Sequence, residues 1–98
     1  MSMDQLRLLS IDDLLILKYL SESRLSVTAI AGKMRLSQPA ITQRMRKMED
    51  VFGKKLLERK GRGVELTPFG LALAFRASAA LMALDPVALQ VDFPGIQL

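Results

Sequence analysis

Polar and basic side chains share one side of a helix predicted within the stretch RLSQPAITQRMRKMED, residues 35–50. At about 100° per residue, that side carries Gln38, Pro39, Thr42, Gln43 and Arg46, with Lys47 following them. A glutamine amide can pair with an adenine edge, and a threonine can offer its hydroxyl or its methyl group to thymine. Arginine and lysine suit phosphate oxygens. These residue types indicate a helix that reads DNA, while an ordinary solvated helix face is the alternative that the pattern alone leaves open.

A second set of basic residues follows in LLERKGRGVEL, residues 56–66. Two short strands are predicted there, at residues 56–59 and 64–66, with a turn over residues 60–63 whose glycines can supply positive φ. A hairpin this small needs a surface to lie on. Arg59 and Arg62 belong to this segment, and both suit phosphates or a narrow minor groove.

Positive charge is concentrated around these two segments. Residues 33–62 hold ten basic and three acidic residues, a net charge of +7, whereas the whole chain has a net charge of +4. A neutral scaffold with one basic zone suggests a polyanionic partner. From charge alone, a plain solvated surface is an equally good explanation.

The side chains that most enzymes use are absent. The chain has 98 residues, no cysteine and no histidine, so it offers no disulfide framework, no thiolate metal site and no histidine-containing triad. Charges interrupt every apolar run before it reaches the roughly 18 residues of a membrane span, and the first ten residues lack the features of a signal peptide. We therefore expect one small domain that is not an enzyme, with no cofactor, no metal and no membrane association.

Three helices must position the basic zone. They are predicted over residues 11–23, 27–34 and 38–52, and each follows a serine that can cap it: Ser10, Ser26 and Ser37. Pro39 falls in the first turn of the third helix, where its missing N–H has no helical partner to lose. A separate side of that helix carries a core stripe, namely Ile41, Met45, Met48 and Phe52. Gly53 suits the C-terminal cap.

A short turn joins the second and third helices, which predicts a helix-turn-helix, and the basic hairpin makes it winged. The expected fold is mostly α: a winged helix-turn-helix with a three-helix core and a small β-hairpin wing, followed by a long C-terminal linker helix. Residues 1–67 would form the DNA-binding domain and residues 68–85 the linker and dimerisation helix. Residues 86–98 form an apolar tail that the pattern does not classify.

The long helix is predicted from Pro68 to about Leu84, after a cap at Thr67. Its apolar residues form two stripes on nearly opposite sides. Leu71, Phe75 and Met82 form one stripe, and Leu73, Ala77, Ala80 and Leu84 form the other. The domain's own core can cover only one of them, so the second predicts a contact with another subunit. The residues expected at this dimer interface are Leu71, Leu73, Phe75, Ala77, Ala80, Leu81 and Leu84.

Over roughly residues 3–84, the chain resembles the DNA-binding half of the LysR-type transcriptional regulators. Five motif pieces follow one another in the family's order, at residues 37–42, 45–49, 53–59, 61–63 and 66–70. The resemblance implies contacts to bases and nearby phosphates from Gln38, Pro39, Ala40 and Thr42. It implies a minor-groove arginine at Arg62 and a role for Arg59 in supporting the wing or binding a phosphate. It also implies that the long helix pairs with the same helix of a second subunit.

The chain departs from the family pattern in three places. The family usually has arginine where Gln43 stands, which puts the base preference in question. It usually has two alanines at Ile30 and Ala31 and a polar residue at Gly32, so the second helix can pack differently. The family's large ligand-binding domain is not part of this sequence.

Two functions from different classes follow. The first is a bacterial, cytoplasmic, nucleoid-associated transcriptional regulator that binds an interrupted inverted repeat of double-stranded DNA as a homodimer or higher oligomer, with no small-molecule site in this chain. Its expected DNA-binding residues are Ser37, Gln38, Pro39, Ala40, Thr42, Gln43, Arg46, Lys47, Arg59 and Arg62. The second is a protein-interaction module that modulates another regulator by pairing through the long helix. The basic zone favours the first, and the missing ligand-binding domain keeps the second open.

Overall fold

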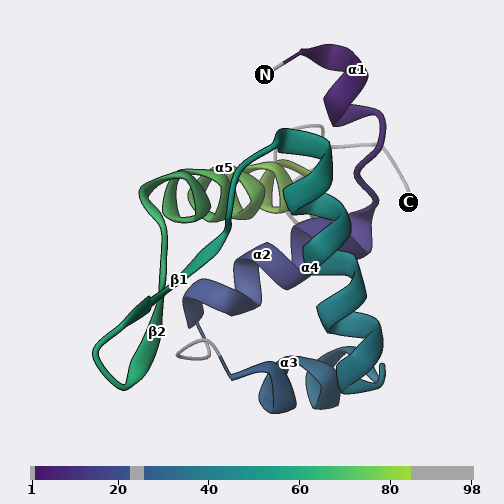
Figure 1. The fold of residues 1–98 in the computed structure, drawn as a ribbon. Coiled ribbons are helices and arrows are strands. Elements are labelled where there is room, and N and C mark those ends of the chain that lie inside the picture. The colour runs from purple at the N-terminus through teal and green to yellow at the C-terminus, as the bar shows by residue number, and fades with distance from the viewer. Residues whose placement is uncertain (1, 23–25, 85–98) are drawn as a thin grey trace.

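The computed structural model describes residues 2–22 and 26–84, which form helices and one β-hairpin (Figure 1). The elements are α1 (Met3–Leu6), α2 (Ile11–Glu22), α3 (Val27–Met34), α4 (Gln38–Phe52), β1 (Leu57–Lys60), β2 (Gly63–Leu66) and α5 (Pro68–Leu84). This order confirms the predicted fold class, a mostly helical winged helix-turn-helix with a long final helix. The tail at residues 86–98 lies outside the described residues.

Side-chain caps begin the helices where the sequence predicts. The hydroxyl oxygens of Ser26 and Ser37 each accept the backbone N–H three residues later, at 3.2 Å, and Thr67 Oγ1 accepts the N–H of Gly70 at 2.9 Å. These bonds satisfy N–H groups that have no partner inside the helix. At the other end of α4, Gly53 adopts a φ of +66° and ends the helix.

The core forms around α2, which packs against α3, α4 and α5. It contains the buried residues Ile16, Leu17, Leu20, Ile30, Ala31, Ile41, Met45, Met48, Phe52, Leu56, Leu73, Ala74 and Ala77. All four residues of the stripe predicted for α4 are among them. Because this stripe is buried in the core, the polar side of α4 faces solvent.

The hairpin is shifted from its predicted limits. Leu57 pairs with Leu66 and Lys60 with Gly63, so Gly61 and Arg62 form a two-residue loop in which Gly61 has a φ of +61°. Positive φ at Gly63 was also predicted, and this is wrong. A two-residue loop with a glycine at positive φ matches the twist of the paired strands.

The prediction that the first strand begins at Leu56 is wrong, because this residue belongs to the core. Its side chain is fully buried. Its N–H donates to Glu49 Oε2 at 2.8 Å, and its carbonyl oxygen accepts the N–H of Thr67 at 2.9 Å. Leu56 therefore joins the end of α4 to the start of α5, and the hairpin projects from this junction.

The two stripes of α5 meet different surroundings. Leu73 and Ala77 are buried, together with Ala74, on the side of α5 that packs against α2. The prediction that places Leu73 and Ala77 at a dimer interface is therefore corrected: both are used by the core of their own chain. The stripe with Phe75 and Met82 is exposed, and so are Ala80 and Leu84 at the far end of the other stripe.

The N-terminal segment adds a short helix that packs near the end of α4. The short helix α1 was not predicted; Ser2 and Gln5 close a reciprocal cap around it, and Gln5 Nε2 donates to the Val51 carbonyl oxygen at 3.0 Å. Across residues 2–22 and 26–84, no helix has the length and apolar character that crossing a membrane requires.

Candidate nucleic-acid interface

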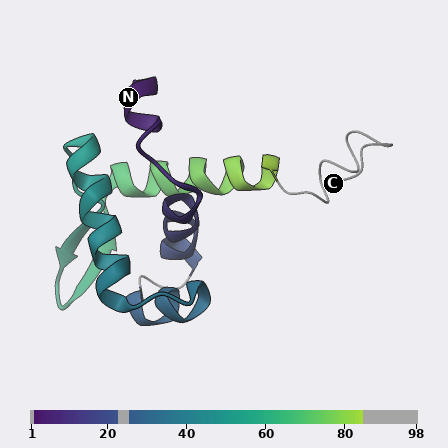
Figure 2. The ribbon, with the colours of Figure 1, turned by 90° about the vertical axis from the view of Figure 1, so that its right-hand side faces the viewer.

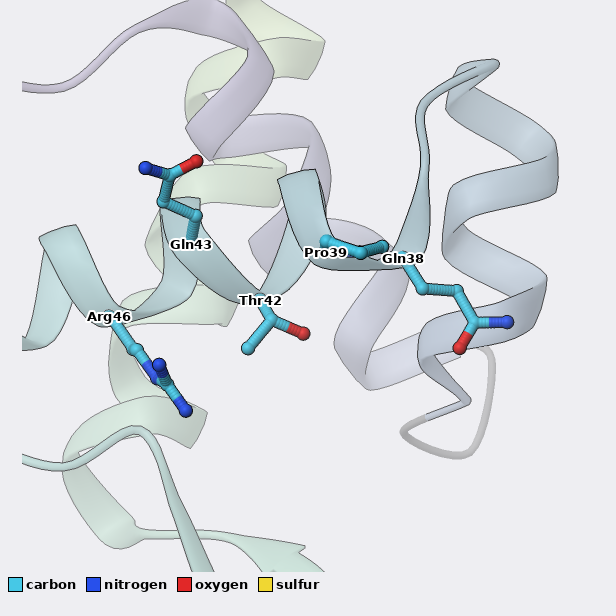
Figure 3. Close-up of a pocket in the computed structure, with 5 residues that line it drawn as sticks. All are labelled: Gln38, Pro39, Thr42, Gln43 and Arg46. Atoms are coloured by element: carbon cyan, nitrogen blue, oxygen red, sulfur yellow. The ribbon is translucent and has the colours of Figure 1, made fainter.

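The outer side of α4 presents polar side chains along its first two turns and beyond. Gln38, Pro39, Thr42, Gln43 and Arg46 line one open hollow on this side (Figure 3). Thr42 is half-buried and the other four are exposed. The structure therefore brings together the five residues that the helical spacing grouped, and leaves them free to meet a partner.

The side chains that line the hollow point in different directions, which helical spacing alone does not show. In Figure 3 the side chains of Gln38, Thr42 and Arg46 leave α4 on one side, whereas Gln43 points away from them. Gln43 also lines a neighbouring hollow with Ala40, Arg44 and Lys47. The outer side of α4 is thus divided into one surface around Thr42 and a second around Gln43.

The N-terminal end of α4 is held by the turn that leads into it. Ser37 uses its hydroxyl oxygen to cap the helix, and its hydroxyl hydrogen stays available to a partner. Before it, Arg35 adopts a left-handed conformation with a φ of +55° and ends α3. This turn makes α3 and α4 the two helices of the motif, with Gln38 and Pro39 exposed in the first turn of α4.

The hairpin lies on the same side of the molecule as α4. Figure 2 shows both of them on one side, while the C-terminal half of α5 extends away on the other. Arg62 stands exposed at the tip of the hairpin, and Arg59 is exposed on β1. A single long partner can therefore contact α4 and the hairpin at the same time.

The two faces of the hairpin differ in charge. Glu58 stands directly opposite Glu65, and Lys60 Nζ lies 3.4 Å from Glu65 Oε2. Arg59 pairs with Val64, and since side chains alternate along a strand, Arg59 lies on the other face. The face with Arg59 is the one compatible with a polyanion, because the opposite face places two carboxylates side by side.

The basic side chains on this side of the molecule differ in their internal contacts. Lys55 Nζ lies 4.0 Å from Glu49 Oε1, and Lys54 Nζ lies 5.2 Å from the centre of the Phe69 ring. Four others make no ion pair with any residue that the structure describes: Arg46, Lys47, Arg59 and Arg62. The charges of these four are available to an anionic ligand.

Arg44 is the site neighbour that the sequence did not reveal. It lies between Gln43 and Met45 on α4, and its guanidinium reaches the start of α2, 3.4 Å from Asp12 Oδ2 and 3.7 Å from Asp13 Oδ1. The spacing of Ser10 and Asp13 is a recognisable capping pattern. The burial of Asp13 and its pairing with Arg44 depend on how α2 and α4 cross, which no local pattern encodes.

Most residues expected at the dimer interface lie exposed on α5. Leu71, Phe75 and Leu84 are 58%, 78% and 56% exposed, Ala80 is exposed and Leu81 is half-buried. Met82, of the same stripe as Phe75, is 72% exposed. Exposed apolar side chains gathered on one helix are typical of a contact surface.

Among the side chains that the structure describes, no three histidine, cysteine or carboxylate residues gather into a cluster that could hold a metal ion. The arrangement instead combines a solvent-facing helix with amide and hydroxyl groups, free cations beside it, and a projecting hairpin with an arginine at its tip. These are groups that recognise an anionic, base-bearing polymer.

Comparisons with known proteins agree with this interpretation. The profile of the bacterial regulatory helix-turn-helix proteins of the lysR family matches residues 11–71. A comparison with curated protein sequences gave no match.

Solved structures give further similarities. The DNA-binding domain of CbnR, solved with DNA, is 33% identical, covers 78% of this chain and 86% of its own, and has a TM-score of 0.67. The DNA-binding domain of BenM, in complex with catB site 1 DNA, is 25% identical with a TM-score of 0.74, and the match covers 92% of this chain and all of that one. Full-length OxyR C199D from Pseudomonas aeruginosa is 22% identical with a TM-score of 0.72, which shows a shared fold; the match covers 90% of this chain and 30% of OxyR.

Proposed function

Because the chain belongs to the lysR family of bacterial regulatory helix-turn-helix proteins, we propose that it binds double-stranded DNA sequence-specifically as a homodimer and regulates transcription. The observation that carries the proposal is the exposed polar side of α4, with Gln38, Thr42 and Arg46 on one surface. The structures of CbnR and BenM that resemble this chain contain DNA, which supports DNA as the partner. They favour it over a module that acts only by pairing with another regulator.

In the proposed complex, the N-terminal half of α4 enters the major groove. The groove is about 12 Å wide, enough for one helix. Gln38 would bind an adenine edge, Thr42 would contact a thymine methyl group or a base acceptor, and Gln43, on the second surface, would reach a neighbouring base or the backbone. Ser37, Pro39 and Ala40 would approach the backbone closely, because they form the first turn of the helix.

Phosphate contacts would hold the helix in place. Arg46 and Lys47 on α4 and Arg59 on the hairpin are exposed cations without an internal ion pair among the described residues, so they can bind phosphate oxygens without breaking a structural contact. Arg62, at the tip of the hairpin, would enter the adjoining minor groove. We accordingly propose residues 1–67 as the DNA-binding part, acting on the bacterial nucleoid in the cytoplasm.

Dimerisation would proceed through the linker helix, residues 68–85. The exposed stripe of Leu71, Phe75 and Met82 can pair with the same stripe of a second chain around a two-fold axis. Such a pair would place two copies of α4 on successive major grooves of an interrupted inverted repeat.

Replacing Gln38 by alanine tests the proposed readout. The probes are the duplex that the wild-type chain enriches from random-sequence DNA, here called the selected duplex, and a random duplex of equal length. Loss of a base contact costs about 1–3 kcal/mol, so Gln38→Ala should lower the preference for the selected duplex by roughly 5- to 160-fold. Fluorescence anisotropy titrations of both duplexes measure the ratio of the two Kd values.

Thr42→Ala should act in the same direction, and Lys54→Ala is the matched control. Lys54 is exposed beside the Phe69 ring, so its loss should weaken both duplexes by the same factor. If Gln38→Ala binds the selected duplex with undiminished preference, α4 does not read bases as proposed.

Replacing Arg62 by alanine tests the wing. A narrow, A·T-rich minor groove has an enhanced negative potential, so Arg62→Ala should weaken binding several-fold more on a selected duplex with A·T flanks than on one with G·C flanks. Arg59→Ala, on the strand of the same hairpin, should affect the two flanks equally. Equal losses for Arg62→Ala on both flanks would leave this residue as a phosphate contact only.

A further inference from the structure

The start of α2 holds a side chain of the recognition helix α4. Arg44 Nη2 lies 3.4 Å from Asp12 Oδ2, and Arg44 Nη1 lies 3.7 Å from Asp13 Oδ1 and donates to Ser10 Oγ at 3.3 Å. The Arg44 side chain is 37% exposed, and the Asp12 side chain is 48% exposed. Arg44 of α4 therefore contacts three polar side chains at the start of α2.

Asp13 is the buried member of this group, with 1% of its surface exposed. Its Oδ2 accepts the N–H of Ser10 at 2.9 Å, while Ser10 Oγ accepts the N–H of Asp13 at 3.2 Å. Oδ1 is buried and accepts no hydrogen bond from any described residue, and Arg44 is the cation that faces it. The charge of this carboxylate is thus balanced by α4.

This pairing restricts how α4 can move on α2. Sliding or rotating α4 would separate Arg44 from a carboxylate that water does not reach, and a buried charge without its partner is strongly unfavourable. Gln43 and Lys47, which belong to the same side of α4 as Arg44, line a common hollow with it. The orientation of the DNA-reading surface is therefore coupled to the Asp13–Arg44 pair.

We propose that Arg44 is a positioning residue for DNA recognition: through Asp13 it sets the angle at which α4 presents Gln38 and Thr42 to the bases, and it does not itself bind phosphate. The inference rests on the proposed function. A positioning role for Arg44 makes the buried carboxylate of Asp13 necessary for sequence specificity, whereas a direct phosphate contact from Arg44 would not.

The test compares Asp13→Asn with Asp12→Asn on the full chain. Both variants raise the net charge by one, which by charge alone strengthens binding to any DNA. The amide introduced by Asp13→Asn keeps an oxygen for the Ser10 N–H but lacks the charge that holds Arg44. We expect Asp13→Asn to lower the preference for the selected duplex over the random duplex at least about fivefold. Asp12→Asn, which leaves the buried pair intact, should keep the preference within about twofold, as expected for an exposed pair.

Arg44→Gln separates positioning from phosphate binding. If Arg44 is a positioning residue, Arg44→Gln should lower the preference for the selected duplex over the random duplex, while the slope of log Kd against log salt stays the same. The double variant Arg44→Gln/Asp13→Asn should lose no more of this preference than either single variant. The double variant also leaves no unpaired buried carboxylate, so it stays informative if Arg44→Gln unfolds.

A direct phosphate contact would give the opposite pattern. Arg44→Gln would then weaken both duplexes equally and reduce the salt slope by about 0.9, while Asp13→Asn kept its preference, and this result would overturn the proposal. A second measurement needs no DNA: residual dipolar couplings of backbone amides report the angle between α2 and α4. We expect this angle to change in Asp13→Asn and not in Asp12→Asn. An unchanged angle in Asp13→Asn would overturn the inference about Arg44. Failure of the wild-type chain to select any duplex would instead refute the proposed function, and the angle measurement would still test the inference.

Discussion

Replacing Phe75 by glutamate is expected to convert the proposed dimer into monomers and to lower the affinity for the selected duplex at least about 100-fold, with the affinity for one half-site unchanged. The size of the effect follows from linkage, since two joined recognition helices bind a full site far more tightly than separate ones. Sedimentation equilibrium measures the oligomeric state, and anisotropy titrations with full-site and half-site duplexes measure the affinities.

Phe75 is a surface residue whose side chain the protomer's own core does not use. Phe75 is 78% exposed and lies on the stripe that the domain's own core does not use. Leu71, Phe75 and Met82 are each more than half exposed, so a second subunit can reach this stripe without displacing another element. A glutamate there would bury an unpaired charge in the contact.

Phe75→Met is the matched control. It keeps an apolar, adaptable side chain at the same position, so the dimer and full-site binding should persist. Neither variant should change the thermal unfolding of the protomer much, because Phe75 makes little contact with its own core. A wild-type chain that stays monomeric at high micromolar concentration would contradict the dimer and the paired-groove geometry with it.

Replacing Gly70 by alanine should lower the free energy of unfolding by roughly 2–3 kcal/mol, a large share of the stability of a small domain. A methyl group at Gly70 would overlap the Leu56 carbonyl oxygen and would lie 3.2 Å from the Leu66 side chain. The Leu56 carbonyl accepts the N–H of Thr67, so it cannot move without breaking the bond that joins the start of α5 to the segment after α4. Urea unfolding followed by circular dichroism at fixed protein concentration measures the change.

Gly32→Ala provides the control with the opposite sign. Gly32 is an exposed position within α3 with nothing within 4 Å of an added methyl group, and nothing in the structure explains why it is glycine. Alanine there should raise the free energy of unfolding by about 0.5–1 kcal/mol. If Gly70→Ala were as stable as wild type, the close approach between α5 and Leu56 would be wrong.

Local signals explain why the helices could be predicted so well. A serine or threonine that caps its own helix, as Ser37 and Thr67 do, acts within three residues, and so does Gly53 at the end of α4. The buried stripe of α4 follows from helical periodicity alone. Because all of these interactions are local, they can be identified in the sequence before the tertiary structure is known.

Two of the errors concern contacts between elements. Both stripes of α5 are apolar, and only its packing against α2 decides that Leu73 and Ala77 enter the core while Phe75 stays outside. Leu56 has the residue type of a strand, yet its place between Glu49 and Thr67 makes it part of the core. These outcomes depend on the arrangement of distant segments, which composition and spacing do not contain.

In the candidate site, too, the local features were predictable from the sequence and the contacts between elements were not. The polar side of α4 was predictable because one helix carries it. The difference between the surface around Thr42 and that around Gln43 required side-chain directions (Figure 3). The pairing of Arg44 with Asp13 required the crossing of two helices that are far apart in the sequence.

Sequencing the DNA that the wild-type chain enriches from a random-sequence duplex pool tests the proposed function most directly. Two α4 helices related by a two-fold axis should select an interrupted inverted repeat, with half-sites about one or two helical turns apart, that is, multiples of roughly 10 base pairs between centres. The positions nearest each α4 should show the strongest base preference, and this preference should weaken in the pool selected by Gln38→Ala. Enrichment of no common sequence, or of a single unrepeated motif, would contradict sequence-specific binding by a dimer of this domain.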